Sequence, residues 1–111
     1  MPFIAAIVLP EQKPNNNTRF TYKATIGGGI WTFVLEYEGQ MFNQQLNMYT
    51  ENRHSWKVVS VDTDQTSVGY STKIFTLNQS RFIRESFIAG LNDRIHIQVT
   101  DYVCVTATVV P

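Results

Sequence analysis

The side chains that could do chemistry are few in this sequence, and their spacing matches no established catalytic or metal-binding pattern. The two histidines, His54 and His96, are the natural candidates for proton transfer or metal ligation. His54 stands beside Ser55 in a polar stretch, and His96 alternates with apolar residues in an expected strand. Neither belongs to an HxH, HExxH or Cys/His arrangement. We therefore expect one histidine in a surface loop and the other on a solvated strand face.

Carboxylates and the single cysteine give no stronger signal. Asp62 and Asp64 could offer oxygens to a hard cation, but the glycine and the distal glutamate of a calcium loop do not follow. A weak cation site there is the minor alternative. Cys104 lies in the apolar run 103–105, where a thiol behaves as a small buried hydrophobe, and the chain contains no Gly-x-Ser-x-Gly elbow. The sequence predicts no enzyme, no metal and no cofactor.

Size and charge limit the class of protein. With 111 residues and 43% hydrophobic content, the chain has the dimensions of one domain, which we expect to cover residues 1–111. Nine basic residues balance nine acidic ones, so no overall field attracts nucleic acid. The apolar segment 1–9 has no basic flank, is too short to span a bilayer and precedes Pro10. We expect a soluble intracellular protein without membrane insertion or a specific nucleic-acid partner.

The elements that would position these side chains are mainly strands. From Arg19 to Ile26 apolar residues alternate with polar ones, three glycines follow, and 30–37 alternates again, which is typical of a β-hairpin. The pattern predicts one mainly antiparallel β-sandwich or partly open barrel of about seven or eight strands. The other expected strands are 1–9, 41–49, 56–63, 68–75, 94–100 and 102–110.

Turn signals and a change of period separate these strands. Residues 10–18 are polar and contain Pro14, which indicates a surface loop or, alternatively, a linker that carries segment 1–9 to a neighbouring subunit. We expect a turn at 38–40 and a polar connection at 50–55. Between residues 79 and 90 the apolar spacing predicts the only helix, a short one, and the alternative is a strand over 81–88.

The order of features between Phe20 and Phe75 carries a family resemblance. An alternating strand leads to a glycine turn and an aromatic strand, and a tryptophan-led strand then precedes an Asp-x-Asp turn and a glycine. This order resembles that of small β-domain virion proteins of contractile-tailed bacteriophages, in particular short baseplate plug proteins. The resemblance implies a non-enzymatic structural subunit in the virion, assembled in the host cytoplasm. Its partners would be other virion proteins or copies of itself.

Contact residues follow from the expected edges and aromatic side chains. No charged residue occurs between Phe3 and Leu9, and an uncharged hydrophobic edge strand is usually covered or paired. The alternative function is a small binding module, in which Trp31, Tyr37, Tyr49, Trp56 and Tyr70 would stack on a saccharide or peptide. The interface candidates are Phe3, Ile4, Ile7, Leu9, Trp31, Tyr49, Trp56 and Tyr70.

Overall fold

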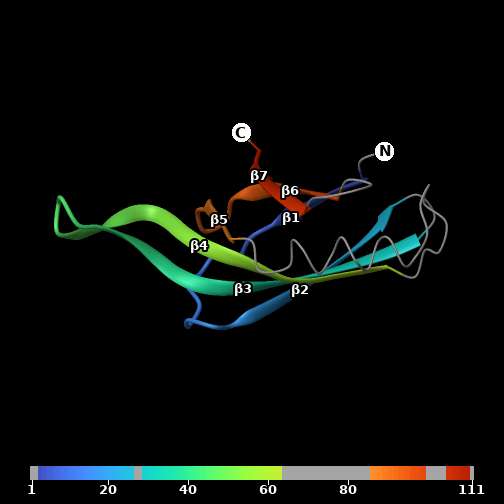
Figure 1. The fold of residues 1–111 in the computed structure, drawn as a ribbon, viewed down its shortest axis with the longest axis horizontal. Helices are drawn as coiled ribbons and strands as arrows, with labels where there is room; N and C mark the ends of the chain where they lie inside the picture. Colours follow the sequence, from blue (N-terminus) through green and yellow to red (C-terminus); the bar gives the residue numbers. More distant parts are fainter. Residues whose placement is uncertain (1–2, 27–28, 64–85, 100–104, 111) are drawn as a thin grey trace.

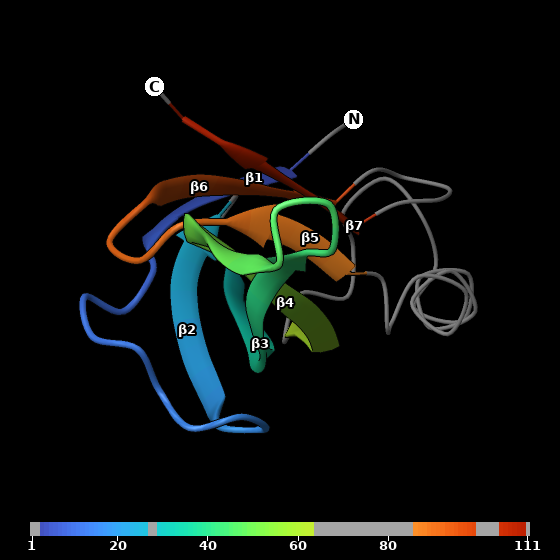
Figure 2. The ribbon, with the colours of Figure 1, turned by 90° about the vertical axis from the view of Figure 1, so that its left-hand side faces the viewer.

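Two antiparallel sheets face each other in a β-sandwich (Figures 1 and 2). The computed structural model describes residues 3–26, 29–63, 86–99 and 105–110, which contain seven strands and no helix. One sheet has the order β1-β6-β7 and the other β2-β3-β4-β5. The strands are β1 Phe3–Val8, β2 Arg19–Ile26, β3 Gly29–Asn43, β4 Met48–Thr63, β5 Ser86–Ala89, β6 Arg94–Val99 and β7 Val105–Val109. The expected β-sandwich is confirmed, and it does not close into a barrel.

Side-chain alternation places the core between the two sheets. Successive residues of a strand point to opposite faces, so Trp31, Phe33, Leu35 and Tyr37 of β3 are all apolar and inward. On β1, likewise, Ala5 and Ile7 are buried, whereas Ile4, Ala6 and Val8 are exposed, and Leu9, which directly follows β1, is also buried. The buried core is formed by Ala5, Ile7, Leu9, Trp31, Phe33, Leu35, Tyr37, Trp56, Val58, Val61, Ala89, Ile95 and Ile97.

The hairpin of β2 and β3 follows the pattern read from the sequence. The two strands pair antiparallel from Arg19 opposite Glu36 to Ile26 opposite Gly29. Phe20, Tyr22 and Ala24 pack against the core, as their alternation predicts. The loop 10–18 is confirmed, and β1 pairs with β6 of the same chain, so the structure gives no support to the linker alternative.

The β3–β4 hairpin differs most from expectation. The predicted turn at 38–40 is wrong, because β3 continues to Asn43, and the predicted connection at 50–55 is wrong, because it lies inside β4. The ladder absorbs the turn-like residues as irregularities, with register shifts at 37–39 and 40–42. Gly39, with φ of 120°, occupies one of them, and few other residues adopt that conformation.

Several predictions fall on parts of the chain that the structure does not describe. The expected strand 68–75 with Tyr70, as well as Asp64 and Cys104, lies outside the described residues. Of the expected helix at 79–90, residues 86–89 form strand β5, which agrees with the strand alternative and corrects the helix there. The reason is tertiary, since Phe87 pairs with Trp56 across the β4–β5 ladder and packs against the core.

Polar side chains tie neighbouring strands together on the outer face of the larger sheet. The Glu36 carboxylate on β3 accepts a hydrogen bond from Arg19 Nε of β2 at 3.1 Å and lies 3.3 Å from Lys57 Nζ of β4. These two contacts, that with Arg19 first, hold the pKa of Glu36 below its usual range. Glu38 accepts hydrogen bonds from the hydroxyls of Ser55 and Ser86, which joins β3 to β4 and β5.

Burial of Trp31 gives a test of the core. Trp31 is 0% exposed, whereas its neighbour Ile30 points outward and is 50% exposed. We expect Trp31→Ala to lower the free energy of unfolding by about 3 to 5 kcal/mol, because it leaves a large cavity. Urea unfolding measures this loss. Ile30→Ala is the matched control, and a comparable loss for both variants would contradict the assignment of Trp31 to the core.

Candidate functional site: a projecting hairpin arm

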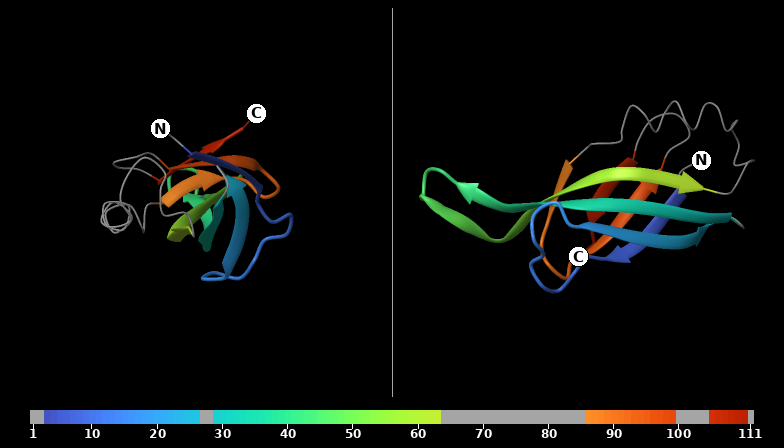
Figure 3. Two further views of the ribbon diagram at one scale, coloured as in Figure 1. Left: turned by 90° about the vertical axis from the view of Figure 1, so that its right-hand side faces the viewer. Right: turned by 90° about the horizontal axis from the view of Figure 1, so that it is seen from below.

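The distal part of the β3–β4 hairpin extends beyond the two packed sheets. We call residues 40–53 the arm. Figures 1 and 3 show it leaving the sandwich at one end, where no strand of the other sheet lies across it. The molecule accordingly measures 49 × 24 × 23 Å along its principal axes. The smaller sheet, which covers β3 and β4 nearer the core, therefore does not cover the side chains of the arm.

Asparagine side chains and backbone shape the tip of the arm. The Asn43 carboxamide oxygen accepts hydrogen bonds from the backbone N–H groups of Gln45 at 3.0 Å and Leu46 at 3.2 Å, which stabilises the turn at 44–47. Asn47 closes the turn with φ of 52°, a left-handed conformation that asparagine tolerates better than most residues. The tip is thus a defined turn.

Hydrogen bonds within the arm bridge its irregular pairing. The Thr50 hydroxyl donates to the Met41 carbonyl at 2.9 Å, and Gln40 Nε2 donates to the Thr50 carbonyl at 3.0 Å. They replace ladder bonds that the register shift between Gln40 and Phe42 interrupts. The two strands of the arm therefore stay together where regular pairing fails.

The base of the arm is fixed to the connection between β5 and β6. Asn52, with φ of 50°, accepts a hydrogen bond from the Leu91 backbone N–H at 2.8 Å. Gly90 approaches Asn52 so closely that an added Cβ would lie 2.7 Å from the Asn52 carbonyl oxygen and 2.5 Å from its Nδ2. Only glycine fits this approach without a shift of the backbone.

Large apolar side chains cover the arm without being buried. Leu46 is 66% exposed and Tyr49 is 61% exposed, and the Phe42 and Tyr49 rings make an edge-to-face contact with centroids 5.1 Å apart. Between Gly39 and Thr50 the chain has no charged residue. An exposed patch of this kind marks an interaction surface more often than a solvated one. Its apolar members are Met41, Phe42, Leu46, Met48 and Tyr49.

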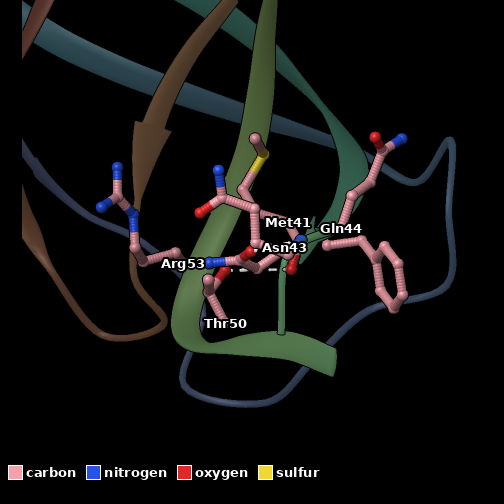
Figure 4. Close-up of a pocket in the computed structure, with 7 residues that line it drawn as sticks. Met41, Asn43, Gln44, Thr50 and Arg53 are labelled. Atoms are coloured by element: carbon pink, nitrogen blue, oxygen red, sulfur yellow. Dashed lines mark hydrogen bonds between the residues drawn. The ribbon is translucent and has the colours of Figure 1, made fainter. Parts of the chain in front are cut away.

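An open depression lies beside this patch. Figure 4 shows Met41, Asn43, Gln44, Thr50 and Arg53 around it, and Phe42 and Gln45 complete the lining. The lining combines apolar surface with amide and hydroxyl groups and one guanidinium. Such a surface suits a protein contact with a few hydrogen bonds. The lining contains no carboxylate.

A buried histidine lies where the arm meets the core. His54 is 2% exposed, its Nδ1 shares a 2.7 Å hydrogen bond with the Tyr37 hydroxyl, and its ring packs against that of Tyr37. Burial, and after it the charge of Lys13, holds the pKa of His54 below its usual range, and burial raises the pKa of Tyr37. The expectation of a surface loop for His54 is wrong, because β4 carries it into the core.

The expected interface residues divide between the core and the surface. Ile4 and Tyr49 are exposed and can make contacts. The side chain of Phe3 and all of Tyr70 lie outside the described residues. The other candidates are corrected to core residues, because each points between the two sheets and is less than a tenth exposed; they are Ile7, Leu9, Trp31 and Trp56.

Other expectations about chemistry have mixed outcomes. His96 is exposed on β6, as expected. Within residues 3–26, 29–63, 86–99 and 105–110, no three His, Cys, Asp or Glu side chains are grouped to hold a metal ion. Of the alternative cation site at Asp62 and Asp64, Asp64 lies outside the described residues. No helix in the described part of the chain is long and apolar enough to cross a membrane.

Sequence reasoning missed the arm although a signal was present. The run 39–50 combines exposed-type amides with Met41, Phe42, Leu46 and Met48 and has no charge. The alternation of residues 41–49 predicts one strand with a single apolar face, but the chain turns at 44–47 and leaves these apolar side chains exposed. The absence of charges over the whole run was the signal that neither face is an ordinary solvated surface.

Comparison of the chain with protein-family models, with curated proteins and with the solved structures gave no match. Function is therefore inferred from the geometry of the arm and of the sheet edges.

Acidification tests the buried histidine. Because the pKa of His54 is lowered in the native state, this side chain binds a proton below about pH 6.5 in the unfolded chain but stays neutral in the native chain. We expect the free energy of unfolding to be highest above that pH and to fall as the pH drops below it. Urea unfolding between about pH 8 and about pH 5 measures this slope. In His54→Phe the slope should become shallower, and an unchanged slope would assign the dependence to other groups.

Proposed function

We propose that this protein is a non-enzymatic structural subunit of a larger protein assembly and that its arm packs against a neighbouring subunit. The observation that carries the proposal is the projecting hairpin, whose apolar side chains the fold leaves uncovered. Met48 and Tyr49 are adjacent in β4 and point to opposite faces, yet both are exposed. A partner could therefore bury apolar side chains on both faces of the arm, as happens when a hairpin inserts between subunits.

The charges near the arm favour a protein partner over a lipid surface. Segments that bind anionic membrane surfaces combine apolar side chains with several lysines or arginines. Here Glu51 and Arg53 flank the tip with opposite charges, and the tip itself is rich in amides. Amide groups can form hydrogen bonds across a protein interface at a lower desolvation cost than charged groups.

The type of assembly that we propose is a bacteriophage virion, in the tail, baseplate or capsid. The support is the resemblance of the segment from Phe20 to Phe75 to small baseplate proteins, together with a zero net charge and an uncharged contact surface. The saccharide- or peptide-binding alternative loses support, because Trp31, Tyr37 and Trp56 are buried and cannot stack on a ligand.

The DNA that flanks the gene tests the proposed type of assembly. Structural genes of a phage cluster by assembly, so we expect neighbours that encode tail-tube, baseplate or capsid proteins. Sequencing several kilobases on each side is sufficient. Neighbours of metabolic or secretory character would contradict the virion proposal and return the binding-module alternative to consideration.

Substitutions in the arm test its role in assembly. We expect the double variant Leu46→Ser with Tyr49→Ser to fold with an unchanged melting temperature, because both side chains are exposed, and to be missing from assembled particles. Mass spectrometry of purified particles measures its incorporation. Ile88→Ser, on the outer face of β5, is the matched control and should be incorporated normally. Normal incorporation of the arm variant would overturn the proposal.

A further inference from the structure

The hydrogen bonds of β1 show which of its backbone groups face the outside. Leu9 N–H donates to the Asp93 carbonyl at 2.9 Å, next to the pairing of Val8 with Arg94. Bonded and non-bonded pairs alternate along an antiparallel ladder, so Ala5 and Ile7 exchange hydrogen bonds with β6 as well. The N–H and C=O groups of Ile4, Ala6 and Val8 therefore point toward the other side of β1.

That other side is a sheet edge. β1 is the terminal strand of the order β1-β6-β7, and no ladder joins it to β2, which packs near it in the other sheet. Among the described residues, no strand thus pairs with the outward groups of Ile4, Ala6 and Val8. Their side chains are exposed and apolar. The partner that fits an edge of this kind is another extended strand, because its backbone can form hydrogen bonds with the unpaired N–H and C=O groups.

The edge of β2 provides a contrast within the same molecule. Tyr37 N–H donates to the Thr18 carbonyl at 2.9 Å, so by the same alternation Arg19, Thr21 and Lys23 direct their backbone groups outward. Two copies paired about Thr21 would place Arg19 of one copy opposite Lys23 of the other. Like charges in such a pair are destabilising. The charges on β2 thus protect that edge, and β1 carries none.

We propose that the β1 edge pairs antiparallel with β1 of a second copy about a two-fold axis at Ala6. Ile4 of each copy then lies opposite Val8 of the other, and the two Ala6 residues face each other. The N–H and C=O groups of all these residues point away from β6, so the two residues of each pair can exchange backbone hydrogen bonds. The two three-stranded sheets become one continuous sheet of the two copies, which is an isologous interface.

Side-chain chemistry favours a second copy over an unrelated strand. Cross-strand pairs of β-branched residues are favourable, and the pairing brings Ile4 and Val8 together on both sides of the axis. Ala6 at the centre is small and leaves room for these pairs. No charge repels the approach, since residues 3–8 are all uncharged. This surface is separate from the arm, so the inference goes beyond the proposed function and does not depend on it.

The mass of the full chain in solution tests the inference. We expect sedimentation equilibrium to show a concentration-dependent approach to twice the monomer mass of 12.7 kDa. Ala6→Lys places two like charges opposite each other at the axis and should give monomers. Because Ala6 is exposed, this variant should keep its fold, which circular dichroism checks. Thr21→Lys, at the matching position of β2, is the control and should still dimerise.

A charge pair tests the register. Ile4→Lys combined with Val8→Glu puts opposite charges across the interface on both sides of the axis and should retain the dimer, whereas Ile4→Lys combined with Val8→Lys should abolish it. Amide hydrogen exchange adds a backbone readout. In the dimer the N–H groups of Ile4, Ala6 and Val8 should be protected, and Ala6→Lys should remove that protection alone, leaving Ala5 and Ile7 protected by β6.

Specific results would overturn the inference. A chain that stays monomeric at every concentration, or a dimer that Ala6→Lys leaves intact, would show that β1 is not the contact. The arm variant with Leu46→Ser and Tyr49→Ser separates this inference from the proposed function. That variant should still dimerise in solution even though it fails to enter particles, and conversion of it to monomers would assign the dimer contact to the arm instead.

Discussion

The long antiparallel ladder between β3 and β4 is the constraint on which the rest of the structure depends. It carries the largest buried side chains, among them Trp31 and Trp56, and both neighbouring strands of its sheet pair with it. The smaller sheet covers its apolar face, and Phe20 of β2 completes the packing through an edge-to-face contact with Trp56. Because one ladder holds the core, the same two strands can continue past it as a stiff arm.

Where β3 and β4 leave the core and become the arm, specific residues pair the buried polar groups and allow the backbone to change direction. At the base, His54 and Tyr37 satisfy each other's polar groups where burial would otherwise leave them unpaired. Gly39 and Asn52 adopt positive φ values, and irregular pairing lets the strands change direction without losing contact. The chain thus maintains two extended strands beyond the last residue that the second sheet covers, which is useful if the arm reaches a neighbour.

The two edge strands β1 and β2 differ in charge. Arg19 and Lys23 put charge on the outer face of β2, a common way to discourage unwanted strand pairing, whereas β1 has only apolar residues. Among the described residues, the arm and the β1 edge both expose apolar surface in a form suited to another protein. In the assembly that we propose, the β1 contact would join copies and the arm would reach a different neighbour.

The sequence by itself determined the strands with clean alternation. Each of these strands has one face toward the other sheet and one face toward solvent, so its inward residues recur with period two. The inward residues that this pattern predicts are Phe20, Tyr22 and Ala24 on β2 and Ile95 and Ile97 on β6. The number of such strands predicts a β-sandwich or a partly open barrel, and the structure shows the sandwich. The sequence also shows that residues 3–9 carry no charge, and the strand order places this uncharged segment at a sheet edge.

Only the tertiary structure decided which residues end a strand and which apolar side chains remain outside. Local signals at Gly39 and at 50–55 indicate turns, yet both segments lie inside long strands. Pairing between β3 and β4 resumes beyond each irregularity, with Gln40 opposite His54 and Phe42 opposite Tyr49 and residues 50–53 unpaired between them, so tertiary pairing outweighs local preference. Phe42 and Trp56 are both aromatic residues in strands, and the sequence cannot tell them apart. Trp56 is buried because the smaller sheet lies over it, and Phe42 is exposed because that sheet ends before the arm.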